Sequence, residues 1–364
     1  MKKPHRLQSL FSLTAILVLC LVFLLSACSN KDSQAAPTGT EAAVQTEIPI
    51  LTPTPRPSPT PTLPALGMAG NPVVIGFVMA EEEMVQLEAA EDIIFLIAED
   101  TGYVLENRIF PDFAGLADAV QASEVHLFWP SPLEYLYLSE KGSAEILLMT
   151  NHLGVFAYGI QFMANMDHGF IPFFDPETGQ SQGDFISALQ QFAGTRPCFL
   201  NPDSLPGYYI PGGLLAGAST PMLDPVFAYD YSAIVRALYI EGICDFGVGY
   251  ALVGDPRIAG DILQDIPDAQ DVVGIIWQSD GVIPNLSLSA SPVLPLNMQV
   301  QFEEAFLDLA DTSDGLALVS RVLSYDVEAF KTVTDAYYNP LRGILAPLAL
   351  DLETIVTPQS QNTQ

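Results

Sequence analysis

Short apolar runs alternate along residues 72–345 with stretches whose apolar residues recur at helical spacing. The runs are typical of buried strands, and the spaced stretches of helices packed on a sheet. In the first half, the pattern predicts strands at 73–78, 103–109, 125–129, 146–150 and 156–163, and helices at 82–100, 113–122 and 133–139. Because strands and helices alternate with short connections, we expect mostly parallel sheets with helices on both faces.

The pattern restarts in the second half of the chain. It predicts helices at 185–192, 208–215 and 232–240, strands at 197–200, 226–229, 243–250 and 271–278, and a mostly helical segment at 301–355. The chain has no repeat of the length that forms solenoids. The pattern therefore predicts two α/β units followed by a helical end.

The first 27 residues have the composition of a secretory signal. Three basic residues precede an apolar run over residues 10–25, which ends in Leu25-Ser26-Ala27-Cys28. This ending resembles the lipobox of bacterial lipoproteins, in which the cysteine is lipidated and becomes the first mature residue. At about 16 residues the run is short for a membrane span, which is the alternative. We expect an exported protein held at the membrane by a lipid on Cys28.

Residues 28–70 differ from the rest of the chain because they lack apolar periodicity. Prolines alternate with other residues between Thr52 and Pro61. Such a sequence favours extended polyproline conformation. It predicts a stiff tether between the lipid and the folded part; the alternative is a ligand for a proline-binding module.

The charge balance excludes some partners. The chain has 13 Lys and Arg against 43 Asp and Glu, a net charge of −30. Removing the signal takes three basic residues and no acidic one, which leaves −33. Since no stripe of Lys and Arg exists to displace counterions from phosphates, nucleic acid is excluded as a general partner.

Motifs of common enzymes are missing from the sequence. It contains no Gly-x-Ser-x-Gly, His-Glu-x-x-His, Walker loop or Gly-x-Gly-x-x-Gly. The four histidines are scattered at positions 5, 126, 152 and 168. We therefore expect no bond chemistry, no metal site and no cofactor.

Two cysteines remain in the folded part. Cys198 and Cys244 lie in the first and third predicted strands of the second unit, and these strands are usually neighbours in a doubly wound sheet. An exported protein permits a disulfide between them. The alternative is two small buried apolar side chains.

Five segments, in order, are similar to motifs of the phosphate-, phosphite- and phosphonate-binding proteins of ABC transporters. The segments are Phe110-Pro111-Asp112-Phe113, Trp129-Pro130-Ser131-Pro132-Leu133-Glu134-Tyr135, Asn201-Pro202-Asp203-Ser204-Leu205-Pro206-Gly207-Tyr208, Glu241-Gly242-Ile243-Cys244-Asp245-Phe246-Gly247 and Gly281-Val282-Ile283-Pro284-Asn285. The resemblance implies a type II periplasmic-binding-protein fold with a ligand cleft between two lobes. It places one lobe at 71–160 and 279–345, the other at 161–278, and a tail at 346–364.

The resemblance also implies the ligand contacts, with departures from the family pattern. The expected contacts are Phe113, Tyr135, Ser204, Tyr208, Tyr231, Ser232 and Asp280. In the family's Ser-Thr-Ser anion cradle only Ser204 keeps its hydroxyl, because Leu205 and Pro206 follow, and proline has no N–H. Ser232, beside Tyr231, stands where the family has histidine, and Phe113 where it has tyrosine. Of two family carboxylates, Asp280 remains and Leu252 replaces the other.

These departures leave the ligand class open. With few basic residues, an anion site would depend on helix N-termini and hydroxyl groups. A cleft lined by aromatic residues, Trp129 among them, would suit a less charged or aromatic ligand; for each ring, core packing is the alternative.

The resemblance implies a monomeric, lipid-anchored solute-binding protein that closes on a small molecule and delivers it to an ABC permease. The default ligand is a phosphonate- or phosphate-like oxyanion, and a neutral or aromatic solute is second. The alternative function is a sensor whose closure is read by a membrane histidine kinase.

Overall fold

The computed structural model describes residues 63–80 and 83–358. The predicted signal, Cys28 and most of the predicted tether lie outside the described residues. Within the described ranges, no helix combines the length and the apolar character needed to span a bilayer.

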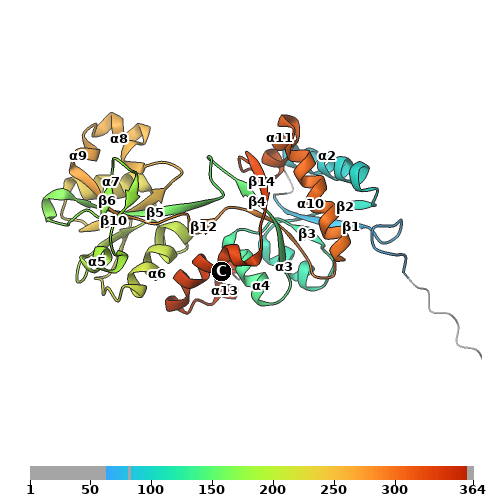
Figure 1. Cartoon of the computed structure of the whole chain (residues 1–364), viewed down its shortest axis with the longest axis horizontal. Helices are drawn as coiled ribbons and strands as arrows, with labels where there is room; N and C mark the ends of the chain where they lie inside the picture. Colours follow the sequence, from blue (N-terminus) through green and yellow to red (C-terminus); the bar gives the residue numbers. More distant parts are fainter. Residues whose placement is uncertain (1–62, 81–82, 359–364) are drawn as a thin grey trace, which may run out of the picture. The chain divides into compact units, whose positions relative to one another are not determined.

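The first sheet has six strands in the order β14-β4-β13-β3-β1-β2 (Figure 1). Their bounds are β1 Val73–Val78, β2 Leu105–Phe110, β3 Leu127–Phe128, β4 Glu145–Asn151, β13 Ser287–Ala290 and β14 Ala329–Thr332. β1 pairs in parallel with β2 and β3. β13 is antiparallel to β3 and β4, and β14 is antiparallel to β4.

Helices cover both faces of this sheet. α2 (Met84–Thr101), α10 (Leu296–Ala310) and α11 (Ser313–Leu323) lie together on one face, where Ile93 and Phe302 share an apolar core with Ile75. α3 (Phe113–Gln121) and α4 (Pro132–Glu140) contribute to a second core. α3 begins at Phe113 because the Asp112 carboxylate accepts a hydrogen bond from the Gly115 N–H at 2.9 Å.

The second sheet has the order β11-β5-β10-β8-β9, and β12 also pairs with β5. The bounds are β5 Ala157–Asn165, β8 Pro197–Phe199, β9 Val226–Phe227, β10 Phe246–Ala251, β11 Val273–Gln278 and β12 Ile283–Pro284. β10, β8 and β9 run parallel, whereas β5 lies antiparallel between β10 and β11. A small hairpin of β6 (Phe174–Asp175) and β7 (Gln180–Ser181) is separate.

The helices of the second unit are mostly short. They are η1 (Met166–His168), α5 (Phe185–Gln190), a π-helical turn η2 (Leu205–Tyr209) that continues into α6 (Ile210–Gly217), α7 (Tyr231–Ile240), η3 (Pro256–Ile258), α8 (Gly260–Asp265) and α9 (Ala269–Val272). α7 begins at Tyr231 because Asp230 accepts from the Ala233 N–H at 2.8 Å.

The C-terminal segment contacts helices of both units. It comprises η4 (Asp335–Tyr338), α12 (Asn339–Leu345), η5 (Ala346–Leu348) and α13 (Leu352–Val356). Gly213 of α6 packs so closely on the Ile344 carbonyl that a β-carbon would collide with it. Glu353 of α13 forms an ion pair with Lys141, next to α4, at 3.0 Å.

The predicted α/β fold class is confirmed. The expectation of mostly parallel sheets is wrong, because many of the strands pair antiparallel. In the described first sheet, three of the five strand pairs are antiparallel. The added antiparallel strands gave little sequence signal. β13 is short and serine-rich. Ser287 and Ser289 are fully buried, and a hydrogen bond of 3.3 Å joins their Oγ atoms. β14 lies inside the segment that was expected to be mostly helical.

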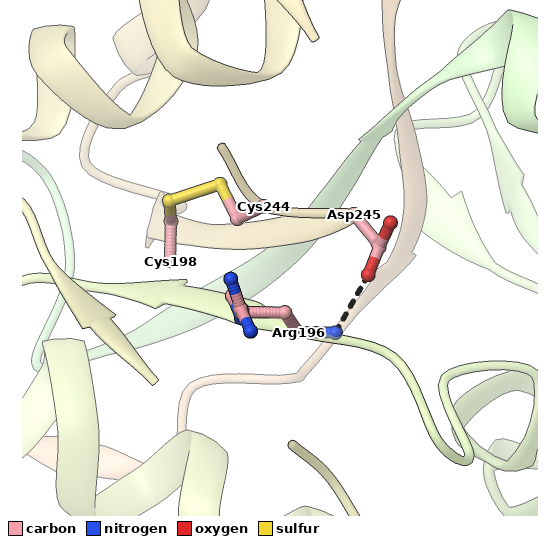
Figure 2. Close-up of a disulfide and its surroundings, with 4 residues drawn as sticks. All are labelled: Arg196, Cys198, Cys244 and Asp245. Carbon is pink, nitrogen blue, oxygen red and sulfur yellow. Dashed lines mark hydrogen bonds between the residues drawn. A yellow bond between two sulfur atoms is a disulfide. The ribbon is translucent and has the colours of Figure 1, made fainter. Parts of the chain in front are cut away.

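The predicted disulfide is confirmed. Cys198 of β8 and Cys244, just before β10, are bonded and buried, with Cα atoms 5.6 Å apart (Figure 2). β8 and β10 are parallel neighbours, as the prediction required. Beside the disulfide, the Arg196 N–H donates to the Asp245 carboxylate at 2.7 Å. Together these bonds tie the first residues of the two strands.

Candidate functional site

The predicted anion cradle is a tight turn at the start of η2. Ser204 caps the turn, and its Oγ accepts from the Gly207 N–H at 2.9 Å. The Ser204 carbonyl accepts from the N–H groups of Tyr208 and Tyr209, both at 3.0 Å. Since Pro206 has no N–H, few backbone donors of this turn remain for a ligand. Gly207 is required here because a β-carbon would collide with the Leu200 side chain.

Tyr231, at the start of α7, carries an unusual hydroxyl. The hydroxyl is buried, and no described residue forms a hydrogen bond with it. Its ring meets Tyr250 edge-on, with centroids 5.1 Å apart. Burial and the charge of ionised Tyr158 raise the pKa of Tyr231, whereas the Ser204 hydroxyl, which lies within its reach but outside normal hydrogen-bond geometry, lowers it. A buried hydroxyl without a partner is costly, so this group is suited to a polar ligand atom.

Tyr208, in η2, forms part of an aromatic group at the carboxyl ends of β8 and β9. Its ring packs edge-on against Phe199 and Phe227, each with centroids 5.5 Å away. The side chain is only partly buried. Ser204, Tyr208 and Tyr231 thus come together at one end of the second sheet.

Ser232 follows Tyr231 but serves another purpose. Its hydroxyl donates to Asp261 at 3.0 Å, and this bond lowers the pKa of that carboxyl. Arg236 pairs with the same carboxylate at 3.0 Å. The hydroxyl that stands at the family's histidine position is therefore occupied by a bond between α7 and α8.

Tyr135 is held by the C-terminal segment. Its side chain is 1% exposed, its hydroxyl donates to Asp335 at 2.9 Å, and its ring lies 4.2 Å from that of Tyr338. Arg342 pairs with Asp335 at 2.5 Å and lowers the pKa of that carboxyl. Burial raises the pKa of Tyr135. In this structure the Tyr135 hydroxyl has a protein partner and is not free for a ligand.

Two further aromatic candidates are core residues. Phe113 is 7% exposed and packs edge-on against Tyr137, with centroids 6.4 Å apart. Trp129 is 8% exposed and stacks on Phe330 at 5.8 Å. Trp129 therefore packs in the core, which was the alternative to lining a cleft.

Asp280 lies where the chain returns from the second sheet toward the first. Its side chain is exposed. Its main-chain carbonyl accepts a hydrogen bond from the Ser279 hydroxyl at 2.8 Å. The segment runs against Gly159 of β5, where a β-carbon would lie 2.8 Å from the Asp280 carbonyl oxygen. This close approach fixes the Asp280 backbone next to β5.

The sequence pattern did not indicate two further residues, Tyr158 and Lys331. Tyr158 of β5 influences Tyr231, and burial raises its own pKa to about 12. Lys331 of β14 lies against the rings of Phe156 and Tyr337, with 4.3 Å from Nζ to each centroid. The only local signal was a lysine between the apolar residues Phe330 and Val333. In the described part of the chain, no group of three or more His, Cys, Asp or Glu is placed to hold a metal ion.

Comparison with known proteins gives a family and a fold. The model of the family described as "ABC transporter, phosphonate, periplasmic substrate-binding protein" matches residues 75–338. The phosphate-import protein PhnD of Mycolicibacterium smegmatis is 25% identical over 215 residues, which cover 55% of this chain and 60% of that protein. The match thus spans less than two thirds of this relative's length.

Solved structures of low sequence identity share the fold. XAC2383 from Xanthomonas citri, bound to chloride ion, has a TM-score of 0.52 at 15% identity, with 78% of this chain and 98% of that chain covered. The same protein bound to ATP has a TM-score of 0.50 at 16% identity, with 78% and 97% covered. The chain thus shares with these structures a mixed α/β fold, in which helices flank the sheets.

Proposed function

Because the chain belongs to the family of periplasmic substrate-binding proteins of phosphonate ABC transporters, we propose that it captures a small oxyanion outside the cytoplasm and delivers it to an ABC importer. The proposal takes residues 71–160 and 279–345 as one lobe, 161–278 as the other, and 346–364 as a tail. Closure of the lobes on the ligand would be the signal that a permease recognises.

The ligand contacts in this proposal start from Ser204, Tyr208 and Tyr231. The observation that carries it is the buried, unpartnered hydroxyl of Tyr231 beside the capped turn at Ser204. A ligand oxygen that pairs with this hydroxyl would remove the cost of leaving it unsatisfied. Asp280 is the candidate for a positively charged group on the ligand, because its carboxylate is exposed next to β5.

The turn at Ser204 should bind a bare phosphonate more weakly than the family's Ser-Thr-Ser motif would. Leu205 and Pro206 supply neither hydroxyl, and Ser204 already binds Gly207. The aromatic groups at Tyr208, Phe199 and Phe227 support a ligand with an organic substituent that packs on rings. We therefore propose an organic oxyanion rather than inorganic phosphate as the preferred ligand.

The location proposed for the protein is the outer side of the cell membrane. The basic start, the apolar run and the Leu-Ser-Ala-Cys ending support a lipid on Cys28. The protein would work as a monomer at the end of its proline-rich tether.

A thermal-shift series on the full-length protein in detergent tests the proposal. The probes are methylphosphonate, phosphite, phosphate, methanesulfonate and the neutral heterocycle nicotinamide. A ligand at about a hundredfold excess over its Kd stabilises by about 2.7 kcal/mol, which corresponds to a rise in Tm of about 5 °C for a domain of this size. We expect the rise with methylphosphonate. A rise with nicotinamide and none with any oxyanion would contradict the proposed ligand class.

A further inference from the structure

Lys331 is a cation held by aromatic rings. It lies in β14, and its Nζ is 4.3 Å from the ring centroids of both Phe156 and Tyr337. The ammonium also donates a hydrogen bond to the Tyr337 hydroxyl at 3.1 Å. Its strand neighbour Phe330 points into the core of the first sheet, so Lys331 faces the opposite side. Rings stabilise a cation without neutralising its charge.

The other basic residues of the described chain are engaged differently. Ion pairs with carboxylates occupy five of them, namely Arg108, Lys141, Arg236, Arg257 and Arg342. Arg196 and Arg321 are exposed and have no ion pair with a described residue. Lys331 is the one partly buried basic residue in the described ranges that no described carboxylate pairs. In a chain with 43 acidic residues, this exception needs an explanation.

A row of side chains connects Lys331 to the candidate site. Phe156 immediately precedes β5, and Tyr158 lies two residues on, so both rings are on the same face of the extended segment. Ile160, two residues beyond Tyr158 on the same face of β5, pairs across the sheet with Tyr250, whose ring meets Tyr231 edge-on at 5.1 Å. The rings of Phe156, Tyr158 and Tyr231 pack against the same apolar core. The row thus runs from Lys331 over Phe156 and Tyr158 to Tyr231.

We propose that Lys331 binds the acidic group of the ligand, while the hydroxyls at Tyr158, Tyr231 and Ser204 bind its other polar atoms. This inference rests on the proposed function and reverses the expected orientation, in which the acidic group sits at the start of η2. The ligand class is an organic oxyanion whose charged oxygens face Lys331 and whose remaining oxygens face these hydroxyls.

The geometry gives Lys331 the properties of an anion contact. An ammonium has three donors, and one of them is used by Tyr337. The partial burial between two rings strengthens its attraction to a negative charge relative to an exposed lysine. The two rings also restrict the flexible side chain before the ligand arrives, which lowers the entropy cost of binding.

Substitution of Lys331 in the full-length protein tests this inference by calorimetric titration with methylphosphonate, phosphate and methanesulfonate. Lys331→Gln and Lys331→Met both remove the charge and keep an unbranched side chain that is one atom shorter. We expect each variant to bind the anion that wild type binds with a Kd raised by about tenfold or more. Arg321→Gln is the matched control, since it removes one positive charge from an exposed cation of the first unit, and we expect a change of less than about twofold.

The outcomes separate this inference from the proposed function. Suppose that wild type binds an oxyanion, and that both Lys331 variants keep the wild-type Tm and bind it with a Kd within about twofold of wild type. The role of Lys331 is then overturned and the proposed function stands. If wild type binds none of the three anions, both are overturned. Equal losses in Lys331→Gln and Arg321→Gln would show an effect of overall charge and would also overturn the inference.

Discussion

The unpaired hydroxyl of Tyr231 predicts opposite effects of one substitution on stability and on binding. Tyr231→Phe removes a buried oxygen that no described residue satisfies. An unsatisfied buried polar group costs about 1–3 kcal/mol, so the ligand-free variant should be at least as stable as wild type, and up to about that much more stable. Ligand binding should weaken by about 1–3 kcal/mol, or about 5- to 150-fold in Kd, because the bond to the ligand is lost.

Two assays on the same preparations measure these effects. Urea unfolding without ligand gives the change in stability, and titration calorimetry gives the change in Kd. Tyr239→Phe is the matched control, because Tyr239 lies on the same helix and its hydroxyl donates to Asp268 at 3.0 Å. That variant should lose a little stability and bind normally. A Tyr231→Phe protein that is destabilised by more than about 1 kcal/mol, or that binds as wild type does, would refute the assigned role.

Three further predictions concern the framework. Replacing Cys198 and Cys244 together by Ala opens a loop with a sequence separation of 46, and the loop-entropy relation gives a loss of about 4 kcal/mol in chemical unfolding; a loss under about 1 kcal/mol would contradict it. Asp335→Asn should cost about 1 kcal/mol at neutral pH, since Asp335 accepts from Tyr135 and pairs with Arg342. The folded pKa of Asp335 is lowered, so its carboxylate contributes to the free energy of unfolding above the unfolded pKa of about 3.9. This contribution is lost as the pH falls through the folded pKa. A stability difference between variant and wild type that persists in acid would argue against this ion pair. Gly213→Ala places a β-carbon on the Ile344 carbonyl and should lower the Tm by several degrees, whereas Gly217→Ala, with open space around it, should not; equal Tm values for the two variants would show that α6 and α12 do not pack tightly.

Local sequence patterns were sufficient for the elements with a strong local signal. β1 and β10 are continuous apolar strands, and α3 and α7 begin at capping aspartates. The disulfide followed from the order of strands in a doubly wound unit. In each case the relevant information lies within a few residues or in a general rule of chain connection.

Long-range contacts decided the features that the sequence could not predict. The Tyr135 hydroxyl pairs with Asp335, 200 residues further along the chain, so no local pattern marks it as a packed residue. Lys331 acquires its aromatic neighbours from Phe156 and Tyr337, which belong to separate elements. β13 has too little apolar character to be recognised, since its buried serines satisfy one another. The fold class was thus easier to predict than the side chains that surround a ligand.

Isothermal titration calorimetry of the full-length protein with methylphosphonate tests whether the chain is a binding protein for an organic oxyanion. We expect saturable heat with one site per chain, and weaker binding of phosphate under the same conditions. Absence of saturable heat with methylphosphonate, in a preparation that unfolds cooperatively, would contradict the proposed function.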